Sequence, residues 1–188
     1  MWIVTDSEWV TSGRAHTLSR IDPASNQVTA TIRVGNGPTR VAVGRDAVWV
    51  ATEIDASLVR VDPASNTVTA TIPIGYGALA VAATSRAVWV SGGLDPRVSR
   101  IDPASNRVVA RITVGRETWG AAVGAGGVWV TTMSADTLSL IDPTTNKVVA
   151  GRTRKTGHGP LGIAIGQDAI WVANKHDNTV WRIDPQAT

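Results

Sequence analysis

The sequence predicts an all-β protein folded as a β-propeller of about five four-stranded blades. Three observations predict this fold: a repeat of about 40 residues, four short β-rich runs in each repeat, and turn residues between the runs. Four antiparallel strands at this period are typical of propeller blades. With 188 residues, 43% of them apolar, the chain is long enough for one domain with a substantial core.

The repeat is marked by four residue types that keep one register. Successive members are 40 residues apart, with a single step of 42 before the last unit. The markers are Trp9, Trp49, Trp89, Trp129 and Trp171; Asp22, Asp62, Asp102, Asp142 and Asp184; Asn26, Asn66, Asn106 and Asn146; and Gly35, Gly75, Gly115 and Gly157. The two extra residues fall in "GRTRKTGHG", which we interpret as a loop insertion.

The second repeat shows the four runs in order. The inner run "RVAVG" is followed by "AVWVAT", and "LVRVD" leads through the turn "PASN" to "TVTATIPIG". Val, Ile, Thr and Trp favour strands, and no run has the length or the 3.6-residue spacing of a helix. The first two runs are nearly continuously apolar, so we expect neighbouring blades to cover both of their faces. A parallel β-solenoid would need shorter coils and fewer turns per repeat.

The recurring "DPASN" segment is interpreted as a turn between the third and fourth strands. Aspartate accepts backbone hydrogen bonds, proline presets its φ angle, and asparagine tolerates the left-handed conformation that ends such a turn. One active site does not need five copies of its acid, so these aspartates are turn formers. The repeated tryptophan is expected to anchor the core between blades.

The whole chain is assigned to one propeller domain, 1–188, with repeats at approximately 1–37, 38–77, 78–117, 118–159 and 160–188. In the first repeat "WIV", at positions 2–4, must serve as the inner strand, and the fifth repeat stops after its Asp-Pro turn, so the last blade is incomplete. Nineteen strand-like runs result. Three arrangements stay open: a small five-bladed ring, an open arc or fragment of a larger propeller, or copies that assemble as a homo-oligomer through the incomplete last blade.

Composition excludes several classes of function. The net charge is only +3 and the basic residues are scattered, whereas nucleic-acid binding needs a clustered basic face. The absence of cysteine excludes disulfides, thiolate metal sites and cysteine nucleophiles. No apolar run approaches the ~20 residues of a membrane helix, and the N-terminus does not resemble a signal peptide. We therefore expect a soluble chain without membrane insertion, in a compartment that composition leaves unknown.

The unit "GPxGIAIGxxAIWVANxxDNTVxRIDP", from Gly159 to Pro185, resembles the YVTN-type and streptogramin (virginiamycin B) lyase-like bacterial propellers. The resemblance extends over essentially the whole chain. It implies the fold, whereas the units of this family serve many functions. Because members are often secreted or located in the cell envelope, the resemblance favours such a location.

The lyase branch implies a Mg²⁺-assisted elimination that opens cyclic depsipeptides, with His and Glu on the top face of the ring. Its histidine follows a proline just before the inner strand. The matching positions here are Thr39, Ala78, Trp119 and Leu161. His158 lies two residues before Pro160, and Glu117 two before Trp119. The constellation is not matched, so no catalytic residue is assigned, and Mg²⁺ is expected only if the lyase alternative holds.

Candidate binding residues lie where the repeats differ. Propeller ligands bind the face that carries the loops from the fourth strand to the next inner strand and from the second strand to the third. These loops bring nine candidates to one rim: His16, Arg40, Glu53, Tyr76, Glu117, Trp119, His158, Lys175 and His176. A polar mouth with two aromatic side chains suits a small polar or anionic ligand. The three histidines lie on three units, so no metal site is predicted.

Our leading interpretation is a noncatalytic binding module that recognises a small polar ligand or a protein partner at this rim, with no cofactor. One alternative is the Mg²⁺-dependent lyase. The other is a structural or engineered repeat scaffold, which the near-identity of the units keeps open.

Overall fold

The computed structural model describes residues 7–75, 77–166 and 168–186. These residues form 18 strands in five antiparallel sheets, and the only helix among them is a three-residue 3-10 turn. The predicted all-β propeller architecture is therefore confirmed. Within the described part of the chain, no helix is both long enough and apolar enough to cross a membrane.

The strands follow the chain from blade to blade. The first two blades contain β1 (Glu8–Ser12), β2 (Thr17–Asp22) and β3 (Gln27–Arg33), then β4 (Pro38–Val43), β5 (Val48–Thr52), β6 (Ser57–Asp62) and β7 (Thr67–Pro73). The third blade contains β8 (Ala78–Ala83), β9 (Val88–Gly92), β10 (Arg97–Asp102) and β11 (Arg107–Thr113). The last two contain β12 (Thr118–Gly124), β13 (Gly127–Thr132), the 3-10 turn η1 (Met133–Ala135), β14 (Thr137–Asp142) and β15 (Lys147–Lys155), then β16 (Pro160–Ile165), β17 (Ile170–Asn174) and β18 (Thr179–Ile183).

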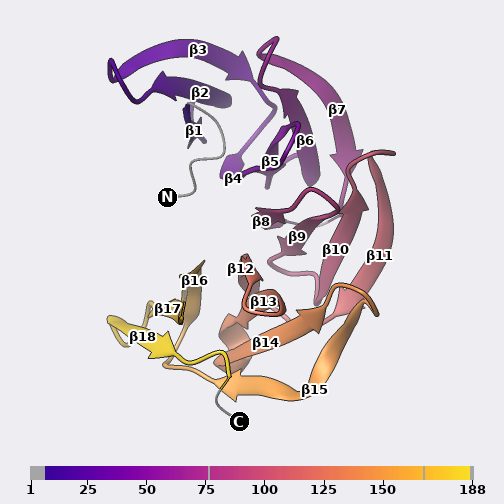
Figure 1. Ribbon diagram of the computed structural model, residues 1–188, viewed down its shortest axis with the longest axis vertical. Coiled ribbons are helices and arrows are strands. Elements are labelled where there is room, and N and C mark those ends of the chain that lie inside the picture. Colours follow the sequence, from indigo (N-terminus) through magenta and orange to yellow (C-terminus); the bar gives the residue numbers. More distant parts are fainter. Residues whose placement is uncertain (1–6, 76, 167, 187–188) are drawn as a thin grey trace.

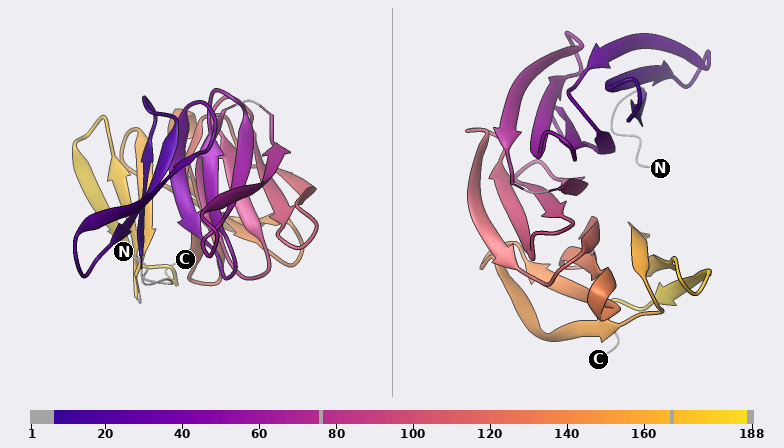
Figure 2. Two further views of the ribbon diagram at one scale, coloured as in Figure 1. Left: turned by 90° about the horizontal axis from the view of Figure 1, so that it is seen from above. Right: turned by 180° about the vertical axis from the view of Figure 1, so that it is seen from behind.

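The five blades stand side by side around an open arc. Strands β4, β8, β12 and β16 line its inside, and β3, β7, β11 and β15 form its outer edge (Figure 1). The first and last blades stand apart across the mouth of the arc, as the view in Figure 1 and the view from behind in Figure 2 (right) show. The last sheet has three strands, in agreement with the incomplete final blade. The expected inner strand "WIV" lies outside the described residues.

The "DPASN" segments form the predicted turns. In the second blade the carboxylate of Asp62 accepts the backbone N–H of Ala64 at 2.9 Å and the hydroxyl of Ser65 at 2.8 Å. The N–H of Asn66 donates to the Asp62 carbonyl at 2.9 Å, and Asn66 has a φ of 55°. This left-handed residue ends the turn, as predicted.

The repeated tryptophan anchors the interface between consecutive blades. Trp49, for example, packs with Leu58 of its own blade against Val88 and Val90 of the next. Four of the five tryptophans are at most 8% exposed, as expected. Trp171 is 43% exposed, and for this one the expectation was wrong, because none of the described blades packs over it.

The two extra residues of the last step do not lie in a loop, which corrects that expectation. Strand β15 has nine residues where β3, β7 and β11 have seven. Its pairing with β14 slips between Ser139 and Ile141, and Gly151 in the slipped segment has a φ of 71°. The insertion is therefore absorbed as an enlarged β-bulge within the outer strand.

The first two strands of each blade were expected to be covered on both faces by neighbouring blades, and the structure confirms this only for the second strands. The second strands β5, β9 and β13 are buried throughout, as predicted. Among the first strands only β8 is mostly buried, whereas β4, β12 and β16 are largely half-buried. The inside of the arc is open, so one side of these strands lacks a covering layer.

Candidate functional site

The predicted rim is built by loops that hydrogen-bond to one another across the start of each inner strand. In the second blade the N–H of Glu53 donates to the carbonyl of Gly37 at 2.8 Å. The carboxylate of Asp55 accepts the backbone N–H of Asn36 at 2.7 Å and its side-chain amide at 2.9 Å. These two bonds lower the pKa of Asp55, the backbone one most. Asp55 therefore ties the two classes of loop together.

The rim of the fourth and fifth blades carries a cluster around His158. Its Nδ1 atom lies 3.1 Å from both carboxylate oxygens of Asp136, and the N–H of Gly159 donates to the same carboxylate at 2.8 Å. The Gly159 N–H and then the His158 ring lower the pKa of Asp136. The rings of His158 and His176 lie 4.8 Å apart, tilted by 57°. The backbone N–H of His158 donates to the carboxylate of Asp177, and the His158 carbonyl accepts the N–H of His176. These two hydrogen bonds hold the His158 loop in place.

Glu117 occupies a backbone position that is glycine in the other units. Its φ is 57°, and the matching residues Gly37, Gly77 and Gly159 have values of 63° to 70°. A side chain in this left-handed region costs on the order of 1 kcal/mol. The 3-10 turn η1 lies beside Glu117, because the N–H of Met133 donates to the Glu117 carbonyl at 2.9 Å.

Trp119 lies two residues further on, at a slip in the pairing of β12 with β13. The residue is half-buried, and its indole nitrogen is buried without a hydrogen-bond partner among the described residues. An indole N–H usually finds a partner when it is buried. Glu117 and Trp119 together make the fourth unit the one whose rim departs most from the repeat.

The nine candidate residues do not form one cluster. His158, Lys175 and His176 lie together on two loops of the fifth blade, where the N–H of Lys175 donates to the carbonyl of Gly159 at 2.8 Å. Glu117 and Trp119 lie at the start of the fourth blade. The other described candidates belong to the first two blades, on the far arm of the arc: His16, Arg40 and Glu53. Tyr76 lies outside the described residues.

Among the residues that the structure describes, no three His, Cys, Asp or Glu side chains are placed to hold a metal ion. His16 is in the first blade, where its carbonyl accepts the N–H of Val34 at 3.1 Å. His158 and His176 are in ring contact in the fifth. The role of each rim residue in binding stays a prediction.

Two hollows lie away from the predicted rim. The larger, of about 590 Å³, runs along the inside of the arc and is lined by the second halves of the inner strands, residues 41–43, 81–84, 121–123 and 163–165. All of these except Thr84 are Val, Ala or Ile. Sequence reasoning missed this groove because it treated the inner runs as covered on both faces.

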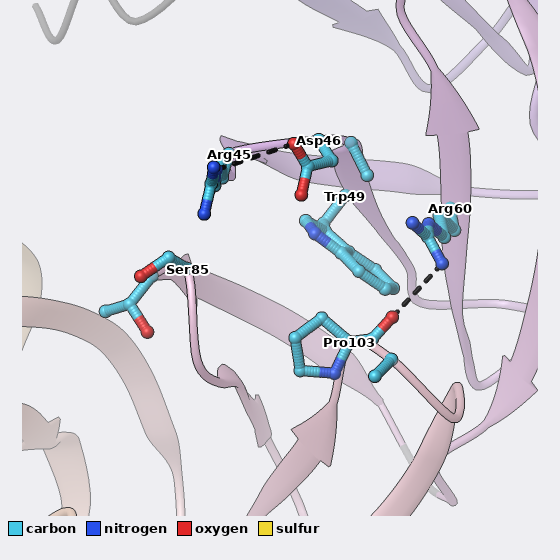
Figure 3. A pocket seen from close by; sticks show the side chains of 9 residues that line it. Arg45, Asp46, Trp49, Arg60, Ser85 and Pro103 are labelled. Atoms are coloured by element: carbon cyan, nitrogen blue, oxygen red, sulfur yellow. Dashed lines mark hydrogen bonds and ion pairs between the residues drawn. The ribbon is translucent and has the colours of Figure 1, made fainter.

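The smaller hollow, of about 220 Å³, lies between the second and third blades at the end opposite the rim. Figure 3 shows Trp49 between the Arg45–Asp46 pair and Arg60, whose guanidinium donates to the Pro103 carbonyl at 3.1 Å. Arg45 and Asp46 form an exposed ion pair of 3.8 Å at its edge. Its charged groups are thus engaged by the protein itself.

Comparison with solved structures places this architecture among known propellers. The chain matches a hydrazine synthase from Kuenenia stuttgartiensis with a TM-score of 0.76 and 14% identity, over 95% of this chain and 63% of that one. It matches a functionally unknown protein from Desulfotomaculum acetoxidans DSM 771 with a TM-score of 0.83 and 18% identity, over 97% and 63%. It matches a catalytically inactive virginiamycin B lyase from Staphylococcus aureus, solved with quinupristin, with a TM-score of 0.74 and 14% identity, over 98% and 69%.

The chain has a streptogramin lyase-like propeller fold. It spans less than two thirds of the length of the first two matched structures. No protein-family model matches it, and no curated protein sequence does.

Proposed function

We propose that this propeller is a noncatalytic binding module that holds a small polar ligand at the rim of its fourth and fifth blades. The observation that carries the proposal is Glu117, a charged residue held at a left-handed position where every matching unit has glycine. Local backbone strain of this kind concentrates at functional sites, because elsewhere it only lowers stability.

The surroundings of Glu117 suit a polar ligand. The adjacent loops present the imidazoles of His158 and His176, a carboxylate at Asp136 and the indole of Trp119. A few polar groups beside an aromatic surface are typical of sites for small polar molecules.

The test replaces the unusual rim residues by those that the chain itself carries at matching positions. These substitutions are Glu117→Gly, Trp119→Leu and His158→Asn, as at Gly37, Leu79 and Asn36. A panel of amino acids, dicarboxylates and sugars is screened by thermal shift and titrated by calorimetry. We expect binding to the native chain, at least tenfold weaker binding to each variant, and no binding to the triple variant.

The matched control is Arg40→Ala, which changes a rim residue of the second blade to the residue found at Ala80 and should leave the affinity unchanged. A triple variant that binds as tightly as the native chain, or a panel without any bound compound, would contradict the proposal. Mg²⁺-dependent cleavage of quinupristin, followed by mass spectrometry, would show instead that the chain is a lyase.

A further inference from the structure

The blades of this chain are joined by a repeated arginine contact. In the first three blades an arginine on the third strand lies over the tryptophan of its own blade, 5.5 to 5.6 Å from the ring centroid. Its guanidinium then donates to the turn of the following blade. Arg60, for example, donates to the Pro103 carbonyl and to the side-chain oxygen of Asn106, each at 3.1 Å.

The same contact recurs along the arc. Arg20 donates to the Pro63 carbonyl at 2.9 Å and to Asn66 at 3.4 Å, and Arg100 donates to Asn146 at 3.1 Å. Each interface therefore combines an apolar layer with a charge-assisted bond to an Asp-Pro-x-x-Asn turn. The turns that connect strands within a blade also serve as acceptors between blades.

The last blade presents this face without a partner. Trp171 is 43% exposed, whereas the tryptophans of the preceding blades are 0 to 8% exposed. Val180 is 64% exposed, and its counterparts Leu18, Leu58 and Leu138 are 0% exposed. Arg182 is exposed, and its guanidinium makes no hydrogen bond within the described part of the chain. The last blade therefore carries the tryptophan, the apolar residue and the arginine that form this interface elsewhere, and no described residue packs against them.

We propose that the exposed face of β17 and β18 binds a further four-stranded propeller repeat whose Asp-Pro-x-x-Asn turn accepts Arg182. The occupant is defined by the interfaces that the chain already contains. It carries β-branched apolar residues opposite Trp171 and Val180, as Val88 and Val90 do opposite Trp49. Its turn supplies a proline carbonyl and an asparagine side-chain oxygen, as Pro103 and Asn106 do for Arg60.

A second copy of this chain fits the face poorly. The first blade of a copy would bring Glu8 to the place where Val48, Val88, Val128 and Ile170 are 0% exposed in the other units. Burying a carboxylate against an apolar face without a partner is unfavourable. Two last blades facing each other would oppose their Arg182 side chains, and neither would supply an acceptor turn.

The experiment supplies such a repeat in the full chain. Residues 185–188 are replaced by a copy of residues 63–115, which begins with the same proline and carries an outer strand followed by one whole blade. We expect amide hydrogen exchange in β17 and β18 to slow at least tenfold relative to the native chain, with a higher urea midpoint. Arg182→Ala in the extended chain should remove part of both gains.

A matched pair of variants tests the face itself. Val180→Asp places a charge on the proposed surface, and Val10→Asp does the same at the far end of the arc, where Val10 is 50% exposed. Val180→Asp should abolish the protection in the extended chain and leave the native chain unchanged, while Val10→Asp should affect neither. Unprotected β17 and β18 in the extended chain, or protection that survives Val180→Asp, would overturn the proposal.

Light scattering of the native chain tests whether a second copy of this chain, instead of a further repeat, binds the exposed face of β17 and β18. A single mass that stays at the monomer value from low to high concentration supports the proposal. A concentration-dependent dimer that Val180→Asp dissolves would show that a second copy binds this face, and would overturn it.

Discussion

The guanidinium of Arg152 lies 5.7 Å from the ring centroid of Trp129, in the place that Arg60 takes over Trp49. The fourth blade has Leu140 at the third-strand position where the first three blades have arginine. The enlarged bulge in β15 brings Arg152 to the same tryptophan from the neighbouring strand. Arg152 also donates to the Pro185 carbonyl in the turn of the fifth blade. A two-residue insertion thus restores a contact that Leu140 removes.

This relationship predicts that Arg152→Ala lowers the free energy of unfolding by about 1–2 kcal/mol, because it removes a cation–π contact and a charge-assisted hydrogen bond. Urea denaturation measures the change. The control Arg107→Ala alters an exposed arginine of β11 and should cost less than about 0.5 kcal/mol. Adding Leu140→Arg to the Arg152→Ala chain should recover part of the loss. Equal losses for Arg152 and Arg107 would contradict the compensation.

Glu117→Gly is expected to stabilise the chain by up to about 1 kcal/mol. Glycine adopts the 57° φ of this position without a steric cost, although its greater freedom in the unfolded chain offsets part of the gain. Chemical denaturation provides the measurement. Ala56→Gly, at a φ of 50° in the second blade, is the control for the backbone effect alone and should give a similar gain. A loss of stability in Glu117→Gly, with a gain in Ala56→Gly, would show that the Glu117 side chain makes stabilising contacts.

The turns predict a loss of stability in acid. The Thr144 N–H and the Thr145 hydroxyl lower the pKa of Asp142 in the folded state. A carboxyl group with a lowered folded pKa stabilises the fold above its unfolded value of about 4, and this contribution disappears as the pH falls through the folded pKa. The melting temperature should therefore drop below pH 4 and stay nearly constant from pH 5 to 7.

Asp142→Asn should reduce this acid-dependent drop, because the amide side chain does not titrate. Thermal melts at pH 7, 5 and 3 measure the difference between the variant and the native chain. The control is Asp46→Asn, because Asp46 is exposed and its carboxylate accepts no backbone N–H among the described residues. This substitution should leave the acid-dependent drop in melting temperature unchanged. An unaltered pH profile in Asp142→Asn would contradict this account of the turn.

The repeated tryptophans should differ in their contribution to stability according to their burial. Trp89→Ala is expected to cost about 3–5 kcal/mol, since Trp89 is 1% exposed and its removal leaves a cavity between two blades. Trp171→Ala is expected to cost less than about 2 kcal/mol, because Trp171 is 43% exposed. Paired urea titrations of the two variants test the contrast. A similar cost for both would mean that Trp171 is covered in solution.

The architecture of a single blade could be predicted from the amino-acid sequence. The spacing of Trp49 and Trp89 and the chemistry of the Asp-Pro-x-x-Asn turn are local signals, because strand propensity, turn geometry and tolerance of a left-handed φ act over a few residues. They predicted the fold class, the turns and the anchoring role of the buried tryptophans. The rim candidates followed from the same register, as the places where the units differ.

The contacts between blades and between rim residues could not be predicted in this way, because they join residues that are distant in the chain. The contact between His158 and Asp136 joins residues 22 positions apart on adjacent blades. The contact between Arg152 and Trp129 depends on a β-bulge that the sequence of β15 does not predict. The open arc, its apolar inner groove and the exposed Trp171 depend on the rotation from each blade to the next. That rotation arises from packing between whole blades and accumulates along the repeat, so no local pattern contains it.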